Sequence, residues 1–279
     1  RQRQMCIRDR RMEKYDITKP MKIPVGMHKL NSDPEISFQL NRLVNMDGCD
    51  LAVAKEIGPA IKSASDFYGV LKSRADSELE QGHIKNAAAL YRMSEFYTDW
   101  EDENGLNAWK KARELFFQYY ADFFSGERPI VKLVKVPYEG CEMPVLKFNA
   151  ESPKGTIVMH GGFDSSYEEF FSECEYLREC GYDVYLFEGP GQGGVMRVQG
   201  MHFTHEWEKP VKAVLDYFGL DDVTIIGISL GGFLAPRAAA FDKRIKRVAA
   251  WSVFPCFQDV IVGMQKPDSV SYTHLRAHE

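Results

Sequence analysis

Residues 224–236, TIIGISLGGFLAP, constrain the fold of this chain more than any other stretch. A β-branched run stops at Gly227, Ser229 follows, and alanine-rich apolar sequence begins after Gly231. A strand that bends sharply into a helix strains the residue at the bend, and glycines two positions before and after it relieve the crowding. We therefore predict a strand over 223–228, a bend at Ser229 and a helix over 231–241. A glycine-rich helix start with Ser229 as its N-cap is the plainer alternative.

Such a bend suits a nucleophile. A serine hydroxyl reacts when it is exposed, deprotonated by a base and faced by donors for the developing oxyanion. A short apolar strand ends at His160, and the Gly-Gly pair after it frees backbone amides. We predict Ser229 as nucleophile, with oxyanion donors at the amides of Leu230 and Gly162, or Phe163 instead of Gly162. His160 precedes the serine, and we interpret it as a structural residue hydrogen-bonded within the turn.

The apolar pattern changes its period near residue 125. Before this point it is helical, with Asp33 as a plausible N-cap. We expect helices over 63–81, 84–97 and 104–124. After it, strands and helices alternate, which predicts a mostly parallel sheet with helices on both faces. We expect strands over 130–136, 143–148, 156–159, 183–187, 223–228 and 248–254, and helices over 168–180, 207–218 and 231–241.

These patterns divide the chain into a helical N-terminal or cap region, residues 12–126, and an α/β domain, residues 127–269. The two ends look foreign to both. The final ten residues, VSYTHLRAHE, resemble translated sequencing-adapter sequence, and QMCIRDR near the start resembles the same kind of contaminant. We expect residues 1–11 and 270–279 to be artefact tails and exclude them from the fold.

Several motifs together are more specific than the bend alone. They are HGGFDSSYEE at 160–169, FEGPGQG at 187–193, WEKPVKAVLDY at 207–217 and GISLGG at 227–232. On these residues the chain resembles α/β hydrolases. More narrowly, it is similar to the group of the fermentation-respiration switch esterase-like proteins, 2,6-dihydropseudooxynicotine hydrolase and the fungal polyketide-shortening hydrolases. That group also carries a helical region before its catalytic domain, and the resemblance spans about residues 33–259. One departure is Glu188, where the family usually has aspartate.

The resemblance implies a serine hydrolase acting on carboxyl esters or related acyl or C–C bonds. In this fold the catalytic acid and histidine follow the serine along the chain. The histidines after Ser229 are His274 and His278, both in the suspected adapter tail. We interpret Asp242 as a surface residue, and His202 and His205 as pocket-rim or surface residues. Asp259 could be an acid in a variant arrangement, but we favour a lid or loop residue, and Asp268 lies beside the junction with the tail. We expect a C-terminally truncated hydrolase whose sheet is incomplete at its C-terminal edge, with acid and base absent and little or no activity.

Composition limits the alternatives. Net charge is −5, with 44% hydrophobic and 27% charged residues, a soluble globular balance that favours neither nucleic acid nor a membrane as partner. The six cysteines form no CxxC pair or zinc spacing, and no signal peptide is recognisable, which predicts a cytoplasmic protein. We expect no metal and no cofactor, and a small-molecule acyl or ketone substrate. The oligomeric state is left open. The rival hypothesis is a non-catalytic helical binding module, built on the hairpin around Gly82, fused to a relic hydrolase domain.

Overall fold

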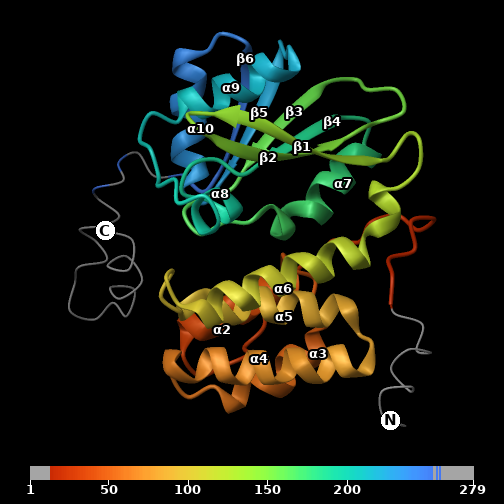
Figure 1. The fold of residues 1–279 in the computed structure, drawn as a ribbon, viewed down its shortest axis with the longest axis vertical. Helices are drawn as coiled ribbons and strands as arrows, with labels where there is room; N and C mark the ends of the chain where they lie inside the picture. Colours follow the sequence, from red (N-terminus) through yellow and green to blue (C-terminus); the bar gives the residue numbers. More distant parts are fainter. Residues whose placement is uncertain (1–12, 254–255, 257, 259–279) are drawn as a thin grey trace. The chain divides into compact units, whose positions relative to one another are not determined.

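The computed structural model describes residues 13–253, 256 and 258 of the chain. The chain divides into two compact units, with the division between Asp122 and Phe123 (Figure 1). The boundaries expected at residues 11, 126 and 269 stay predictions, and the expected tail at 270–279 lies outside the described residues.

The first unit is helical. Its α-helices are α2 (Pro34–Asn45), α3 (Leu51–Ile57), α4 (Ala64–Gln81), α5 (Ile84–Ser94) and α6 (Glu103–Tyr119). Short 3₁₀ turns η1 (Gly58–Ala60) and η2 (Glu95–Tyr97) extend α3 and α5, and η3 (Ala121–Phe124) follows α6.

Local capping explains where these helices begin and end. The Asp33 carboxylate accepts hydrogen bonds from the first amides of α2, as its position before Pro34 predicts. The Asp66 side chain accepts from the Ser63 amide at 3.0 Å, so Ser63 caps α4. Gly82 ends α4 in the left-handed conformation, with φ of 85°, where a side chain would be strained. The strongest sequence signals for helix ends are therefore confirmed.

Two predicted helices end earlier than expected. The segment predicted as a helix over 84–97 leaves the α-helix after Ser94 and continues as η2. The helix predicted over 104–124 ends at Tyr119, because Tyr120 has φ of −94° and ψ of 18°. The chain then turns through η3 and buries Phe123 with its ring centroid 5.3 Å from that of Phe171. Aromatic composition alone did not reveal this change of direction.

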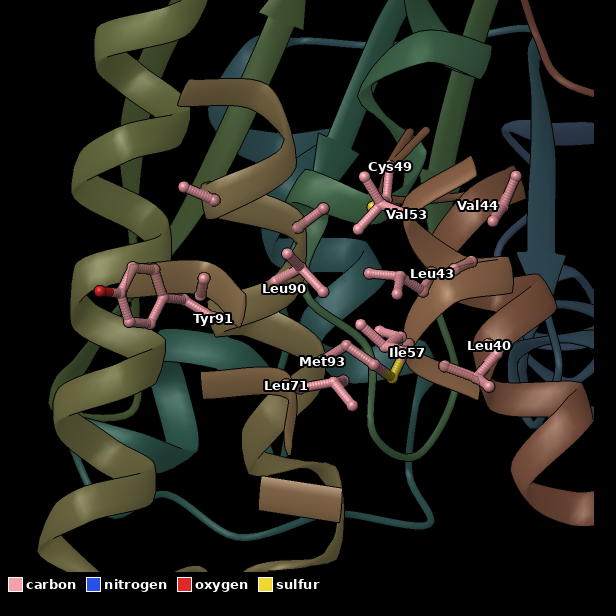
Figure 2. Packing of buried hydrophobic residues seen from close by; sticks show 14 of the residues in the cluster. Leu40, Leu43, Val44, Cys49, Val53, Ile57, Leu71, Leu90, Tyr91 and Met93 are labelled. Atoms are coloured by element: carbon pink, nitrogen blue, oxygen red, sulfur yellow. The ribbon is translucent and has the colours of Figure 1, made fainter. Parts of the chain in front are cut away.

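One apolar core holds the helical unit together. Figure 2 shows part of it, with side chains from α2, α3, α4 and α5 pointing toward one another. Leu43, Leu71 and Leu90 are fully buried in it. Burying one such side chain contributes about 2 kcal/mol to the free energy of unfolding. The core therefore explains the spacing of the apolar residues along these helices.

The second unit is built on one six-stranded sheet. Its strands are β1 (Val131–Tyr138), β2 (Cys141–Phe148), β3 (Thr156–His160), β4 (Asp183–Phe187), β5 (Val223–Ile228) and β6 (Ile245–Trp251), in the order β1-β2-β4-β3-β5-β6. The β1–β2 and β2–β4 pairs are antiparallel, and the β4–β3, β3–β5 and β5–β6 pairs are parallel. The helical elements are η4 (Tyr167–Phe170), α7 (Phe171–Glu179), α8 (Gly193–Arg197), α9 (Glu208–Phe218) and α10 (Gly231–Phe241).

The sheet is covered on both faces, as predicted. On one face Val158 and Ile225 pack in a single cluster with side chains of α9 and α10, among them Val214 and Leu234. Successive residues of a strand point to opposite faces. Met159 accordingly faces α7, where its Sδ lies 3.5 Å from Cys174 Sγ. The mostly parallel α/β architecture expected from the alternating pattern is confirmed.

Several strand boundaries differ from the prediction, chiefly at the turn between β1 and β2 and at the start of β6. The connection between the strands expected over 130–136 and 143–148 is shorter than predicted, because Glu139 and Gly140, at φ of 44° and 81°, make a two-residue turn. The last strand was expected over 248–254. It begins at Ile245, which pairs with Val223, and residues 254 and 255 lie outside the described part. Its exposed Lys246 and Arg247 interrupt the apolar pattern, which hid the start of the strand.

Candidate active site

Ser229 lies at the bend between β5 and α10. It has φ of +58°, in the left-handed region that side chains rarely adopt, and the residue is exposed. A regular helix start would not require this conformation, so the N-cap alternative is wrong. The Ser229 amide donates to the Trp251 carbonyl at 2.9 Å. In the described part of the chain, the Ser229 hydroxyl has no hydrogen-bond partner, which leaves it accessible.

The two flanking glycines are required by crowding. A Cβ on Gly227 would lie 1.9 Å from the Gly231 carbonyl oxygen and 2.8 Å from Ala235 Cβ. A Cβ on Gly231 would lie 2.6 Å from the Gly161 carbonyl oxygen. Real Cβ atoms do not approach backbone this closely. The physical reason given for glycine at both positions is therefore confirmed.

The glycine loop after β3 lies against this bend. β3 and β5 pair in parallel, with His160 opposite Gly227, so their carboxyl ends meet at one edge of the sheet. A Cβ on Gly162 would lie 2.7 Å from the Leu230 amide nitrogen and 2.9 Å from Ser229 Cβ. The predicted nucleophile, the Leu230 amide and the predicted oxyanion loop are thus next to one another.

The amide of Gly162 is already engaged in this structure. It donates to Ser165 Oγ at 2.8 Å, and both residues are buried. Among the described residues, the Leu230 amide has no acceptor. The bond to Ser165 counts against Gly162 as the donor from the loop, and Phe163 is the alternative named from the sequence. The oxyanion roles of Leu230, Gly162 and Phe163 stay predictions.

His160 is a structural residue, as interpreted from the sequence. Trp207 Nε1 donates to its Nε2 at 3.2 Å, so Nδ1 carries the proton and donates to the Gly161 carbonyl at 3.0 Å. Complete burial of the ring lowers the pKa of His160 to about 4. A neutral imidazole with both nitrogens in hydrogen bonds cannot accept the proton of Ser229.

Of the other acid and base candidates, His202, His205 and Asp242 lie in the described part of the chain, and none of these three is hydrogen-bonded to Ser229. His202 and His205 are exposed in the segment before α9. Asp242 follows the end of α10 that lies away from Ser229, and its carboxylate pairs with Arg244 at 2.6 Å. The hydrogen bond from Arg244 lowers the pKa of Asp242, which makes this aspartate half of a salt bridge rather than a partner for a histidine. Asp259, Asp268, His274 and His278 lie outside the described residues.

Two buried side chains had no role assigned from the sequence, although the glycine-rich motif containing them was recognised. Glu188 accepts hydrogen bonds from the amides of Tyr167 at 3.1 Å and Gly194 at 2.8 Å. Gln192 donates from Nε2 to the carbonyls of Gly161 and Gly162. The signal that could have found them is a polar residue inside a glycine-rich run directly after a strand, where it can reach neighbouring backbone.

In residues 13–253, 256 and 258, no three histidine, cysteine, aspartate or glutamate side chains converge as a metal site would require. No helix within that part combines the length and apolar character needed to span a bilayer.

Comparison with known proteins identifies the fold's family. Residues 156–267 match the model of the alpha/beta hydrolase fold. The chain belongs to the α/β-hydrolase superfamily. This α/β hydrolase is 35% identical to the alpha/beta hydrolase psoB of Aspergillus fumigatus, over 85% of this chain and 62% of that protein. It is 33% identical to 20-hydroxy-prefusarin hydrolase FUS2 of Gibberella moniliformis, over 79% of this chain and 61% of that protein. It is 41% identical to hydrolase acrC of Aspergillus aculeatus, over 61% of this chain and 46% of that protein.

Solved structures give the same fold. The crystal structure of 2,6-dihydroxy-pseudo-oxynicotine hydrolase matches this α/β hydrolase with a TM-score of 0.58 and 21% identity, over 85% of this chain and 74% of that one. At this identity the likeness concerns the fold alone. The chain spans 44% to 62% of the length of the curated relatives LUC6, acrC, psoB and FUS2. Because these relatives are named as hydrolases but are covered only in part, hydrolase function is supported at the level of the family.

Proposed function

We propose that this α/β hydrolase is a serine hydrolase that acts on carboxyl esters or related acyl or C–C bonds, with Ser229 as nucleophile. The observation that carries the proposal is an exposed serine in left-handed conformation, with the Leu230 amide and the glycine loop beside it. In the reaction, Oγ attacks a carbonyl carbon and the carbonyl oxygen becomes an oxyanion. The amide of Leu230 and one amide of the 160–163 loop stabilise that charge.

The proton of Ser229 needs a base. His160 is excluded by its two hydrogen bonds. In the chain order typical of this fold, the acid and the histidine follow the serine. The only histidines after Ser229 are His274 and His278, in sequence that resembles an adapter. We therefore propose that the catalytic acid and histidine are not supplied by this chain and that its turnover is weak.

The chemistry of Ser229 is compatible with several classes of substrate. An acyl-serine or an equivalent oxyanion serves esters, ketone C–C bonds and, more remotely, peptides, so the bend by itself does not separate them. We propose a small-molecule acyl or ketone substrate and a cytoplasmic location.

Acetylation by p-nitrophenyl acetate tests the nucleophile. The full chain is mixed with the ester, nitrophenolate release is followed, and the acetylated residue is identified by peptide mass mapping. We expect slow acetylation at Ser229, abolished in Ser229→Ala and retained in Ser252→Ala. Ser252 is a suitable control because it is exposed and also has a positive φ, of 108°.

Each outcome separates the hypotheses. Acetylation elsewhere, or none at all, contradicts a nucleophilic Ser229 and favours the non-catalytic binding module fused to a relic hydrolase domain. Rapid, repeated turnover that depends on Ser229 supports the nucleophile but contradicts the absence of acid and base. Slow acetylation without turnover supports both parts of the proposal, because an oxyanion hole alone retains part of the catalysis.

A further inference from the structure

We propose that Gln192 is a positioning residue for the oxyanion hole, because its side-chain amide sets the direction of the Phe163 N–H. This inference rests on the proposed function of Ser229 and assigns a role to the glutamine of the 187–193 motif. Gln192 is 1% exposed and comes from the segment between β4 and α8, whereas the loop that it contacts follows β3.

The contacts of Gln192 use its whole side-chain amide. Nε2 donates to the carbonyl oxygens of Gly161 at 3.0 Å and Gly162 at 2.8 Å, and Oε1 accepts from the Gly189 amide at 2.9 Å. Both hydrogens on Nε2 thus have acceptors. The reverse amide orientation would place an oxygen against two carbonyls and a nitrogen against an N–H, so the assignment is unique.

Peptide geometry converts these bonds into a direction for the loop amides. The C=O and N–H of a trans peptide point in opposite directions. In the peptide between Gly161 and Gly162, the carbonyl faces Gln192 and the N–H is held by Ser165 Oγ. In the peptide between Gly162 and Phe163, the carbonyl faces Gln192 and the N–H of Phe163 must point away from it. Gln192 therefore sets the direction of the Phe163 amide, whereas Ser165 holds the Gly162 amide.

The surrounding contacts prevent the loop from turning. The Gly193 amide donates to the Ser165 carbonyl at 3.1 Å, which ties the same two segments together a second time. A Cβ on Gly161 would lie 2.2 Å from Ser165 Cβ, so the loop is packed closely. A donor that is already oriented costs no reorganisation when the oxyanion forms. The hydrogen bonds of Gln192 and the close packing of Gly161 orient the Phe163 amide in this way.

The variant Gln192→Glu removes the donors and keeps the shape. Its carboxylate can still accept from Gly189 but repels the carbonyls of Gly161 and Gly162. The matched control is Gln199→Glu, because exposed Gln199 also donates to a backbone carbonyl and accepts from a backbone amide, both of Glu142. Full-length wild type, both variants and Ser229→Ala are compared for the rate of Ser229 acetylation by p-nitrophenyl acetate, thermal midpoint and hydrogen exchange over residues 160–166.

We expect acetylation of Gln192→Glu to be about 10- to 100-fold slower than wild type, with Gln199→Glu close to wild type. A buried carboxyl facing two carbonyls is protonated more easily than a free one, and once protonated it can donate one hydrogen bond. The ratio of the Gln192→Glu rate to the wild-type rate should therefore rise as pH falls from 8 to 5. A loss of packing alone would not produce that pH dependence.

Failure of the inference and failure of the proposed function are distinguishable. If wild type acetylates at Ser229 and Gln192→Glu matches it in rate and exchange, Gln192 has no positioning role. If the variant is slow at every pH by a constant factor, the donor argument is overturned. If wild type shows no Ser229 acetylation, the proposed function fails and the oxyanion role of Phe163 fails with it. Exchange at 160–166 then reports whether Gln192 holds the loop at all.

Discussion

His160 lies beside the glycine loop with both ring nitrogens hydrogen-bonded. Its burial and these two bonds keep the imidazole neutral. Trp207 donates to one nitrogen and the Gly161 carbonyl accepts from the other. Protonation would place a charge where no solvent reaches and would break the bond from Trp207. The loop is therefore stabilised by the neutral histidine.

This residue makes stability depend on pH. Burial lowers the pKa of His160 to about 4 from its ordinary 6.5, so the unfolded chain binds the proton more tightly than the folded one. The contribution of His160 is complete above about pH 6.5 and is lost progressively as pH falls toward 4. In His160→Gln the free energy of unfolding should vary less between pH 7 and 4.5, as measured by urea titration. His205→Gln, an exposed control, should keep the wild-type slope, and an unchanged slope in His160→Gln would contradict this account.

Gly162 is the residue where a single methyl group should have the largest effect on chemistry. Its Cβ would lie 2.7 Å from the Leu230 amide nitrogen, at the distance that an oxyanion would take. We expect Gly162→Ala to slow Ser229 acetylation about 100-fold and to destabilise the unit by about 1–3 kcal/mol. The control is Gly155→Ala, whose Cβ meets only the Tyr182 ring at 3.4 Å. Equal acetylation rates in the two variants would count against Leu230 as a donor.

At the scale of elements, the α4–α5 hairpin is held by a buried carboxylate. Glu78 accepts from Arg74 Nε at 2.7 Å, His83 Nδ1 at 2.8 Å and Asn86 Nδ2 at 3.0 Å, and its side chain is 3% exposed. Burial alone raises the pKa of Glu78, but the hydrogen bonds from Asn86, Arg74 and His83 outweigh it and lower the pKa overall. The carboxylate thus joins the last turn of α4 to the first turn of α5.

Removing this carboxylate should destabilise the helical unit. In Glu78→Ala the buried Asn86 and the partly exposed Arg74 lose an acceptor, as does exposed His83, and we expect a loss of about 3 kcal/mol near pH 7. Because the folded pKa is lowered, the contribution exists above the unfolded pKa of about 4.3 and disappears as pH falls below it. The comparison is with Glu114→Ala, because Glu114 is exposed and pairs with Lys111. Urea titrations at pH 7 and pH 3 check this, and equal losses at both would refute it.

Elements with strong local signals could be predicted from the sequence, and those set by long-range contacts could not. The bounds of β4, β5 and α10 agree with the prediction, because apolar runs end at polar or glycine residues there. The start of β6 was missed because Lys246 and Arg247 look like loop residues until pairing with β5 is known. The site shows the same contrast. Glycine spacing predicted the bend at Ser229, but the hydrogen bonds of Gln192 join segments about thirty residues apart and leave no periodic signal.

At the scale of the whole molecule, each unit has a core of its own. Leu90 belongs to the cluster formed by the helical unit, and Leu215 belongs to the cluster between the sheet and α9 and α10. Among the described residues, neither cluster contains a residue of the other unit. A hydrophobic core is the main source of cooperativity in unfolding. We therefore expect a cavity in one core to weaken that unit first.

The matched variants Leu90→Ala and Leu215→Ala test this expectation. Both leucines are fully buried, so each change should cost about 2–5 kcal/mol. Hydrogen exchange followed by mass spectrometry should show faster exchange in α2 to α6 for Leu90→Ala and in β3 to β6 for Leu215→Ala. If each variant accelerates exchange equally in both units, the chain unfolds as one cooperative block. Selective acceleration would instead mean that the strands holding Ser229 and the glycine loop keep their order when the helical core is weakened.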